Sequence, residues 1–150
     1  MSLRYKHHRF PIEIIDHCVW LLRLKLKPNL QLKGDRQLLT QVLQNLVTNA
    51  IKYNIPNGFI AIETFQSKRQ IIFKISNPSK GLKGGDRQRV FERFHREDTS
   101  HNRKVEGFGL GLSLSREIAR AHGGDLKLEK ETKSKLAAFL LSLPTSLSIL

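Results

Sequence analysis

Residues 35–52 (DRQLLTQVLQNLVTNAIK) constrain the fold more than any other stretch of the chain. Their apolar residues recur every three or four positions, the spacing of one face of an α-helix, and Asp35 stands in the N-cap position before them. Residues 55–58 (IPNG) end the pattern. The alternating segments FIAIETF and RQIIFKIS then predict two strands joined by a short polar turn. We therefore predict a long amphipathic helix followed by a β-hairpin.

The flanking segments extend this mixed α and β pattern. Residues 11–23 carry apolar residues on a helical repeat, and residues 23–35 alternate leucine with polar residues around a turn at Pro28-Asn29, which predicts short strands. A further helix is expected to begin near Leu110 and to end at Gly123-Gly124, which are typical C-cap residues. Residues 125–144 predict a second hairpin whose second strand is apolar enough to be central in a sheet.

Length and composition favour one soluble domain. The 150 residues suffice for a single domain with a core over residues 11–144, and the longest apolar runs are far shorter than the ~20 residues that span a bilayer. The lone cysteine, Cys18, excludes an internal disulfide and suits the cytoplasm. The formal net charge of +13 favours an anionic partner, but the basic residues are scattered along the chain, which argues against nucleic acid.

A run of alternating glycines, Gly107, Gly109 and Gly111, leads into the last predicted helix and suggests a loop that holds phosphate. It is not a dinucleotide fingerprint, which needs GxGxxG after a strand, and the chain has no Gly-Lys pair for a Walker loop. What remains is general physics, because the free N–H groups and positive end of a helix attract an anion. A flexible loop before a buried helix explains the glycines equally well.

The long helix carries a second polar feature. Asn45, Asn49 and Lys52 are spaced at i, i+4 and i+7, so they share one stripe beside the apolar face, with Tyr53 between the two. Mg²⁺ prefers oxygen ligands and usually keeps several waters when it binds nucleotide phosphates, so the stripe is a candidate Mg²⁺-nucleotide site. Taken alone, a solvated helix face is the simpler interpretation.

Three motifs in order resemble a known family. NLVTNAIKYN, VFERFHR and GFGLGLSLSREIARAHGG, all within residues 35–124, resemble the N, F and G2 boxes of sensor histidine kinases. The resemblance implies a catalytic ATP-binding domain of the Bergerat type. This fold is an α/β two-layer sandwich in which a mixed sheet of about five strands packs on about three helices, with a lid over the nucleotide.

The resemblance also implies roles for individual residues. Asn49 matches the Mg²⁺ ligand, and Asn45 matches the position that related hydrolases such as DNA gyrase fill with a general-base glutamate, which an amide cannot replace. Lys52 matches a phosphate-contacting lysine, Tyr53 the aromatic beside the nucleotide, and Arg96 the arginine that reaches the γ-phosphate. The implied catalytic residues are Asn45, Lys52 and Arg96, and the implied nucleotide-binding set adds Asn49, Tyr53, Asn77, Gly81, Leu82, Phe94, Gly107, Phe108, Gly109, Leu110, Gly111 and Leu112.

One family box is altered. The G1 box usually reads DxGxG after a strand, whereas the aligned residues here are Asn77 to Gly81 (NPSKG). The family's aspartate accepts a hydrogen bond from the adenine amino group, and an amide gives a weaker, uncharged bond. An amide nevertheless offers both a donor and an acceptor to adenine, and some sensor kinases resembling heavy-metal sensors have Asn here. Ser79 replaces the box's first glycine and restricts the loop further. We expect nucleotide binding to be retained but reduced.

The phosphoacceptor of the family has no counterpart. Its H box is a histidine followed by an acid, a basic residue and a proline on a helical hairpin, and none of the six histidines has this context. His7 and His8 have similar neighbours at the wrong spacing, His17 precedes Cys18, and His122 caps a helix. The residues between Pro11 and Asp35 are also few for the family's first helix and strand. We therefore expect an acceptor histidine on a separate domain.

The sequence thus predicts an Mg-ATP-binding histidine kinase domain that is inactive alone. The implied partners are ATP, a histidine-containing dimerisation domain and an acidic response regulator, in the bacterial cytoplasm. A non-catalytic module that regulates another kinase by docking is the alternative, and nucleic-acid binding would rest on charge alone. A serine kinase of the anti-sigma type shares the fold without an H box, but ERFHR and the long lid fit it poorly.

Overall fold

The computed structural model describes residues 22–80, 89–92, 111–129 and 135–145. In these residues one five-stranded sheet has the order β1-β2-β3-β5-β4. β1 pairs with β2 in parallel and every other pair is antiparallel, so the sheet is mixed as expected. The strands are β1 (Leu22–Leu26), β2 (Ile60–Ser67), β3 (Gln70–Pro78), β4 (Asp125–Leu128) and β5 (Leu136–Pro144).

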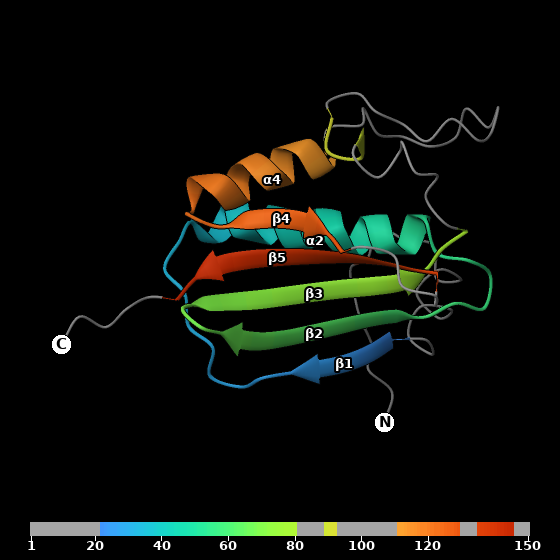
Figure 1. Cartoon of the computed structure of the whole chain (residues 1–150), viewed down its shortest axis with the longest axis horizontal. Coiled ribbons are helices and arrows are strands. Elements are labelled where there is room, and N and C mark those ends of the chain that lie inside the picture. The colour runs from blue at the N-terminus through green and yellow to red at the C-terminus, as the bar shows by residue number, and fades with distance from the viewer. Residues whose placement is uncertain (1–21, 81–88, 93–110, 130–134, 146–150) are drawn as a thin grey trace, which may run out of the picture.

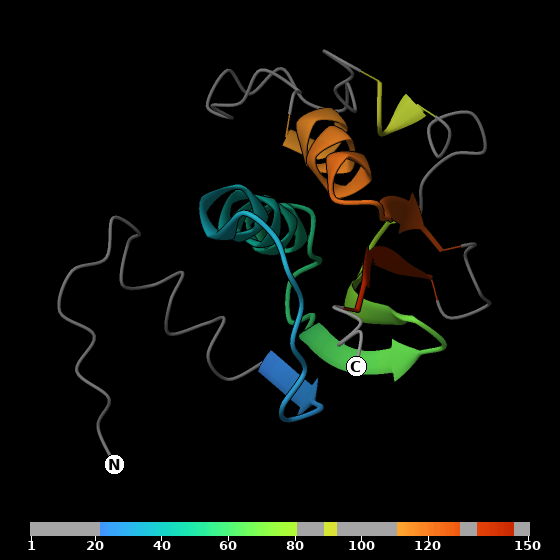
Figure 2. The same cartoon turned by 90° about the vertical axis from the view of Figure 1, so that its left-hand side faces the viewer.

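Two helices lie side by side on one face of this sheet (Figures 1 and 2): α2 (Arg36–Lys52) and α4 (Gly111–Ala121). Val42 and Leu46 of α2 and Ala119 of α4 are fully buried and meet Ile75 of β3 and Leu141 of β5 in the core. The predicted α/β sandwich is therefore confirmed. The described residues contain two helices, and most of the predicted helix over residues 11–23 lies outside them.

The ends of both helices follow from local sequence. Asp35 has an extended backbone and its side chain accepts a hydrogen bond from the N–H of Leu38 at 3.0 Å, which confirms the predicted N-cap of α2. At the end of α4, Gly124 N–H donates to the carbonyl of Ala119 and Gly123 N–H to that of Arg120, both at 2.9 Å. Gly123 takes a φ of 78° there. This is a Schellman motif, as the glycine pair predicts.

The N-terminal part of the fold differs from the sequence prediction in two places. Leu22 and Arg23 belong to β1, so a helix that continues to Arg23 is wrong. The leucines after the turn form no second strand, since residues 30–34 pair with no strand of the sheet. Asn29, with a φ of 60°, turns the chain there, and the following segment crosses to the start of α2 instead of pairing with β1 (Figure 2). Alternation indicated an extended chain but not a pairing partner.

His122 joins the two helices at the ends away from the glycine run. Its Nε2 accepts a hydrogen bond from the N–H of Asp35 at 3.0 Å, and its Nδ1 lies 2.8 Å from the carbonyl of Ile118. Because a carbonyl can only accept, Nδ1 carries the proton and the ring is the neutral tautomer. The predicted capping role is confirmed, and the ring also holds the start of α2 against the end of α4.

Replacing His122 with phenylalanine is expected to destabilise the fold by about 1–2 kcal/mol, because the larger phenyl ring makes neither hydrogen bond and the N–H of Asp35 needs a new partner. The carbonyl of Ile118 keeps its bond from the backbone N–H of residue 122. Urea unfolding at pH 7 measures the change. Lys127→Ala, at an exposed site on β4, serves as the control with a change of no more than about 0.5 kcal/mol. Equal stability of the phenylalanine variant and the wild type would contradict this role.

Candidate functional site

The polar stripe of α2 meets the start of α4. Asn45 is half-buried, and its Nδ2 donates to Ser115 Oγ at 3.1 Å and to the carbonyl of Gly111 at 3.4 Å. Gly111 is the first residue of α4, so the side chain of Asn45 ties the first turn of α4 to the middle of α2. The structure thereby brings together two of the predicted site residues, Asn45 and Gly111, which are 66 positions apart.

Asn49 and Lys52 continue the stripe toward the end of α2. Asn49 is half-buried, and its side chain makes no hydrogen bond to any residue that the structure describes. Lys52 is exposed, and its Nζ lies 5.1 Å from the centre of the exposed Tyr53 ring, within cation–π range. The end of α2 therefore presents an amide, an ammonium group and an aromatic ring.

Asn77 ends up in a different setting, at the edge where β3 leaves the sheet. It pairs with Ala137 of β5, is 4% exposed, and its Nδ2 donates to the carbonyl of Pro78 at 2.9 Å. No other hydrogen bond links its amide to a described residue, so Oδ1 and the second N–H of Nδ2 stay available within the described structure. No hydrogen bond joins Asn77 to another described candidate.

A short turn at residues 89–92 packs beside α4. The ring of Phe91 meets Phe139 of β5 edge to face, with 6.1 Å between ring centres, and the guanidinium of Arg116 lies 4.7 Å above the same ring. Val90 also packs against the core. The turn predicted at VFERF is therefore anchored to the sheet and to α4 immediately before the predicted residues Phe94 and Arg96.

Asp125 anchors the other end of α4 to the sheet. Its Oδ1 accepts hydrogen bonds from Arg116 Nε at 3.1 Å, Arg120 Nε at 3.3 Å and its neighbour Leu126 N–H at 2.9 Å. Burial alone would raise the pKa of the Asp125 carboxyl, but the hydrogen bonds and the positive charges of the two arginines outweigh it and lower the pKa below its ordinary value.

Asp125→Asn is expected to cost about 1–2 kcal/mol of stability at pH 7. The unfolded carboxyl, with its ordinary pKa of ~3.9, takes up a proton first on acidification, so this stabilisation is present above that pH and is lost as the pH falls through the lower folded-state pKa. The gap between the variant and the wild type should therefore shrink below pH ~4. Urea unfolding at pH 7 and below pH ~4 measures the gap. Glu92→Gln is the control, because the exposed Glu92 pairs with Arg89, apart from Asp125 and its arginines. A gap that is the same at both would contradict the assignment.

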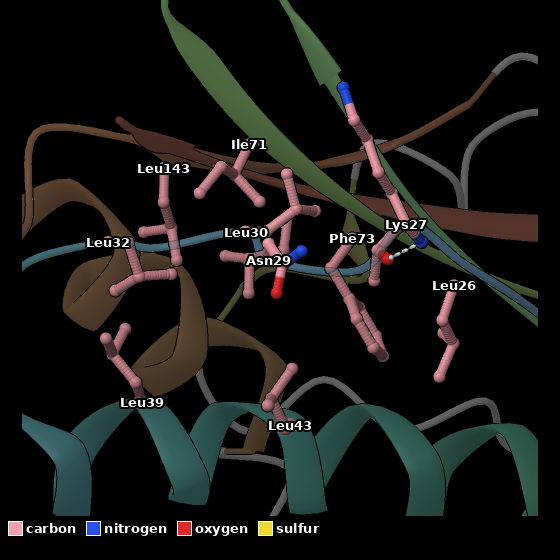
Figure 3. A pocket seen from close by; sticks show the side chains of 12 residues that line it. Leu26, Lys27, Asn29, Leu30, Leu32, Leu39, Leu43, Ile71, Phe73 and Leu143 are labelled. Atoms are coloured by element: carbon pink, nitrogen blue, oxygen red, sulfur yellow. Dashed lines mark hydrogen bonds between the residues drawn. The ribbon is translucent and has the colours of Figure 1, made fainter. Parts of the chain in front are cut away.

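An apolar groove lies elsewhere in the fold, between the first half of α2, the segment that follows β1, and the sheet strands β1, β2, β3 and β5 (Figure 3). Leu39 and Leu43 of α2 point into it opposite Phe73, Ile71 and Leu143 of the sheet (Figure 3), and its volume is about 350 Å³. Its lining includes few polar groups, and none of the predicted site residues is among them. The groove is therefore distinct from the predicted nucleotide site.

The chemistry of the described side chains limits how a metal ion could bind. They contain no group of three or more His, Cys, Asp or Glu side chains that could hold one. An Mg²⁺ ion fits the amide donors of this site only in combination with phosphate oxygens and water, which is its usual mode on nucleotides. Asn49, whose amide has no described partner, and Asn45, whose Oδ1 accepts no described hydrogen bond, each offer an oxygen on the polar stripe of α2.

Part of the predicted set lies outside the described residues, and one contact was missed. Ser115 is fully buried beside Asn45, and the i, i+4 spacing of Gly111 and Ser115 was the signal that could have placed both on one side of the helix. Leu112, also predicted, packs against the core from α4. The predicted residues outside the described structure are Gly81, Leu82, Phe94, Arg96, Gly107, Phe108, Gly109 and Leu110.

A mixed sheet backed by two described helices, with the polar stripe of α2 against the start of α4, fits the α/β sandwich that the three motifs predicted. Residues 34–147 match the family model described as histidine kinase-, DNA gyrase B-, and HSP90-like ATPase. The chain belongs to this family, which confirms the resemblance seen in the three motifs.

Sensor histidine kinases are among the most similar proteins. The chain is 34% identical to sensor histidine kinase WalK of Bacillus subtilis over 100 residues, 65% of this chain and 16% of WalK. It is 34% identical to sensor-like histidine kinase SenX3 of Mycobacterium tuberculosis over 116 residues, 77% of this chain and 28% of SenX3. The structure of mycobacterial sensor histidine kinase MprB matches with a TM-score of 0.72 and 25% identity, over 89% of this chain and 95% of that one.

The chain thus spans less than a third of the length of each of these two kinases. It corresponds to their histidine kinase-like ATPase domain, as the family match over residues 34–147 indicates. Among the helices that the structure describes, none has the length and hydropathy needed to cross a membrane.

Proposed function

We propose that the chain is the catalytic domain of a two-component sensor kinase, which binds Mg-ATP and passes the γ-phosphate to a histidine on a separate dimerisation domain. The observation that carries this proposal is the Asn45 bridge, because it sets the polar stripe of α2 against the first turn of α4, where helix N–H groups attract phosphate. The family match and the similarity to sensor kinases support it.

Different residues bind the adenine and the phosphate ends of the nucleotide. Asn77 recognises adenine through its amide, while Asn49 supplies an oxygen ligand to Mg²⁺ and Lys52 a positive charge to the phosphates. Bound Mg²⁺ would neutralise charge on the phosphates. Asn45 cannot act as a general base, so water is not activated and ATP is kept for transfer. Arg96 is proposed to stabilise the γ-phosphate as it leaves.

Nucleotide selectivity tests the proposal, because an amide at position 77 can pair with adenine. A ligand that binds only the folded state stabilises it, by about 2.7 kcal/mol when the ligand concentration is a hundred times its Kd. This stabilisation raises the midpoint of unfolding. Mg-ATP is expected to raise the midpoint of this chain more than Mg-GTP at the same concentration. A folded chain whose midpoint moves with neither nucleotide would contradict an ATP site.

A docking module without catalysis is the second candidate, because the G1 box reads NPSKG and so lacks its aspartate. Transfer of labelled phosphate from ATP to a separately supplied dimerisation domain separates the two functions. If the chain binds nucleotide but transfers no phosphate to the dimerisation domain of the same sensor, docking is favoured.

The remaining expected partner is an acidic response regulator, which the net charge of +13 suits. We expect the domain to work in the bacterial cytoplasm.

A further inference from the structure

Ser115 lies in the middle of α4 with no exposed surface. A buried hydroxyl in a helix interior costs stability unless it is hydrogen-bonded. The hydroxyl of Ser115 accepts a hydrogen bond from Nδ2 of Asn45 at 3.1 Å.

The contact fixes which way the Asn45 amide faces. An asparagine side chain can flip to exchange its oxygen and nitrogen, so its orientation depends on its partners. Here the carbonyl of Gly111, an acceptor that cannot donate, lies 3.4 Å from Nδ2, and Ser115 Oγ lies 3.1 Å from the same atom. The carbonyl favours the nitrogen toward α4, and the hydroxyl of Ser115, which can accept as well as donate, fits this orientation as an acceptor. Oδ1 is thus turned away from α4.

We propose that Ser115 is a positioning residue for the nucleotide site, acting through Asn45. By accepting Nδ2 it keeps Oδ1 of Asn45 available on the stripe shared with Asn49, and it holds the first turn of α4 at its distance from α2. This inference rests on the proposed nucleotide site, since it says how that site is held in shape. Ser115 belongs to the third sequence motif but is not among the nucleotide-binding residues that the motifs predicted.

Ser115→Ala removes the acceptor and leaves a small side chain that fits the same space. Its matched control is Ser142→Ala on β5, which loses a comparable half-buried hydroxyl bond, from Ser142 Oγ to the carbonyl of Asp125 at 3.3 Å, away from the Asn45 contact. Both variants are first shown to be folded by thermal unfolding. A non-hydrolysable ATP analogue is then titrated into each, with and without Mg²⁺.

Loss of one neutral hydrogen bond predicts that Ser115→Ala weakens binding with Mg²⁺ by about 2- to 10-fold, and binding without Mg²⁺ by less. Ser142→Ala should leave both affinities unchanged. The independent readout is the side-chain amide of Asn45 in ¹⁵N spectra, whose hydrogen exchange should accelerate in Ser115→Ala and stay slow in Ser142→Ala. This signal reports the contact whether or not nucleotide is present.

The outcomes separate this inference from the proposed function. A wild type that binds nucleotide, with Ser115→Ala unchanged or weakened equally with and without Mg²⁺, would overturn the positioning role alone. Unchanged exchange of the Asn45 amide in Ser115→Ala would overturn it as well. A folded wild type that binds no nucleotide would refute the proposed function, and the positioning role with it.

Discussion

Gly124→Ala is expected to destabilise the fold by about 3 kcal/mol or more and to lower the unfolding midpoint by roughly 10 °C. A Cβ at this position would run into the backbone carbonyl of Ser142 on β5, with the Cα of Leu143 also only 3.2 Å away. The neighbour is backbone of a central strand that is hydrogen-bonded on both sides, so it cannot move aside cheaply. Differential scanning calorimetry measures the loss.

The control for this variant is Gly111→Ala in the first residue of α4. Among the described residues, the atom nearest to a Cβ there is Cγ of Asn45 at 3.9 Å, which is an ordinary van der Waals distance. Alanine also favours a helix over glycine, so Gly111→Ala should be neutral or slightly stabilising. If both variants unfold at the same temperature, the close approach of α4's end to β5 is wrong.

Asn49→Ala is expected to remove the strengthening of nucleotide binding by Mg²⁺. Loss of an outer-shell partner typically costs about 10- to 100-fold in metal affinity, and loss of a ligand should cost at least as much. The side chain is half-buried and bonded to no described residue, so the fold itself should change little. Calorimetric titration of an ATP analogue with and without Mg²⁺ measures the effect.

Thr48→Ala is the matched control, because Thr48 precedes Asn49 on α2 and is exposed. Alanine has the higher helix propensity, so this change should leave both stability and nucleotide affinity essentially as they are. If Asn49→Ala keeps the full effect of Mg²⁺, the metal ligand lies elsewhere.

Local sequence predicted the elements where the physics is local. The N-cap at Asp35, the apolar period of α2, the alternation in β2 and β3 and the glycine pair after α4 each act within a few residues, and the structure confirms all of them. The central position of β5 also followed from its apolar composition, because a strand paired on both sides is largely buried.

What the sequence did not predict are contacts across long separations. Ser115 and Asn45 are 70 positions apart, and His122 and Asp35 are 87 apart, so no short-range pattern links either pair. The alternating leucines of β1 indicated a strand, but they did not predict whether other residues bury its side chains. Leu22, Leu24 and Leu26 all remain exposed among the described residues. The candidate site was reached through the motifs, and its internal hydrogen bonds only through the fold.

The most direct test of the account is calorimetric titration of ADP and of a non-hydrolysable ATP analogue into the folded chain, each with and without Mg²⁺. We expect both nucleotides to bind, Mg²⁺ to strengthen the binding of the ATP analogue, and the amide at Asn77 to reduce the affinity without abolishing it. Absence of binding by either nucleotide, from a chain that unfolds cooperatively, would contradict a working ATP site.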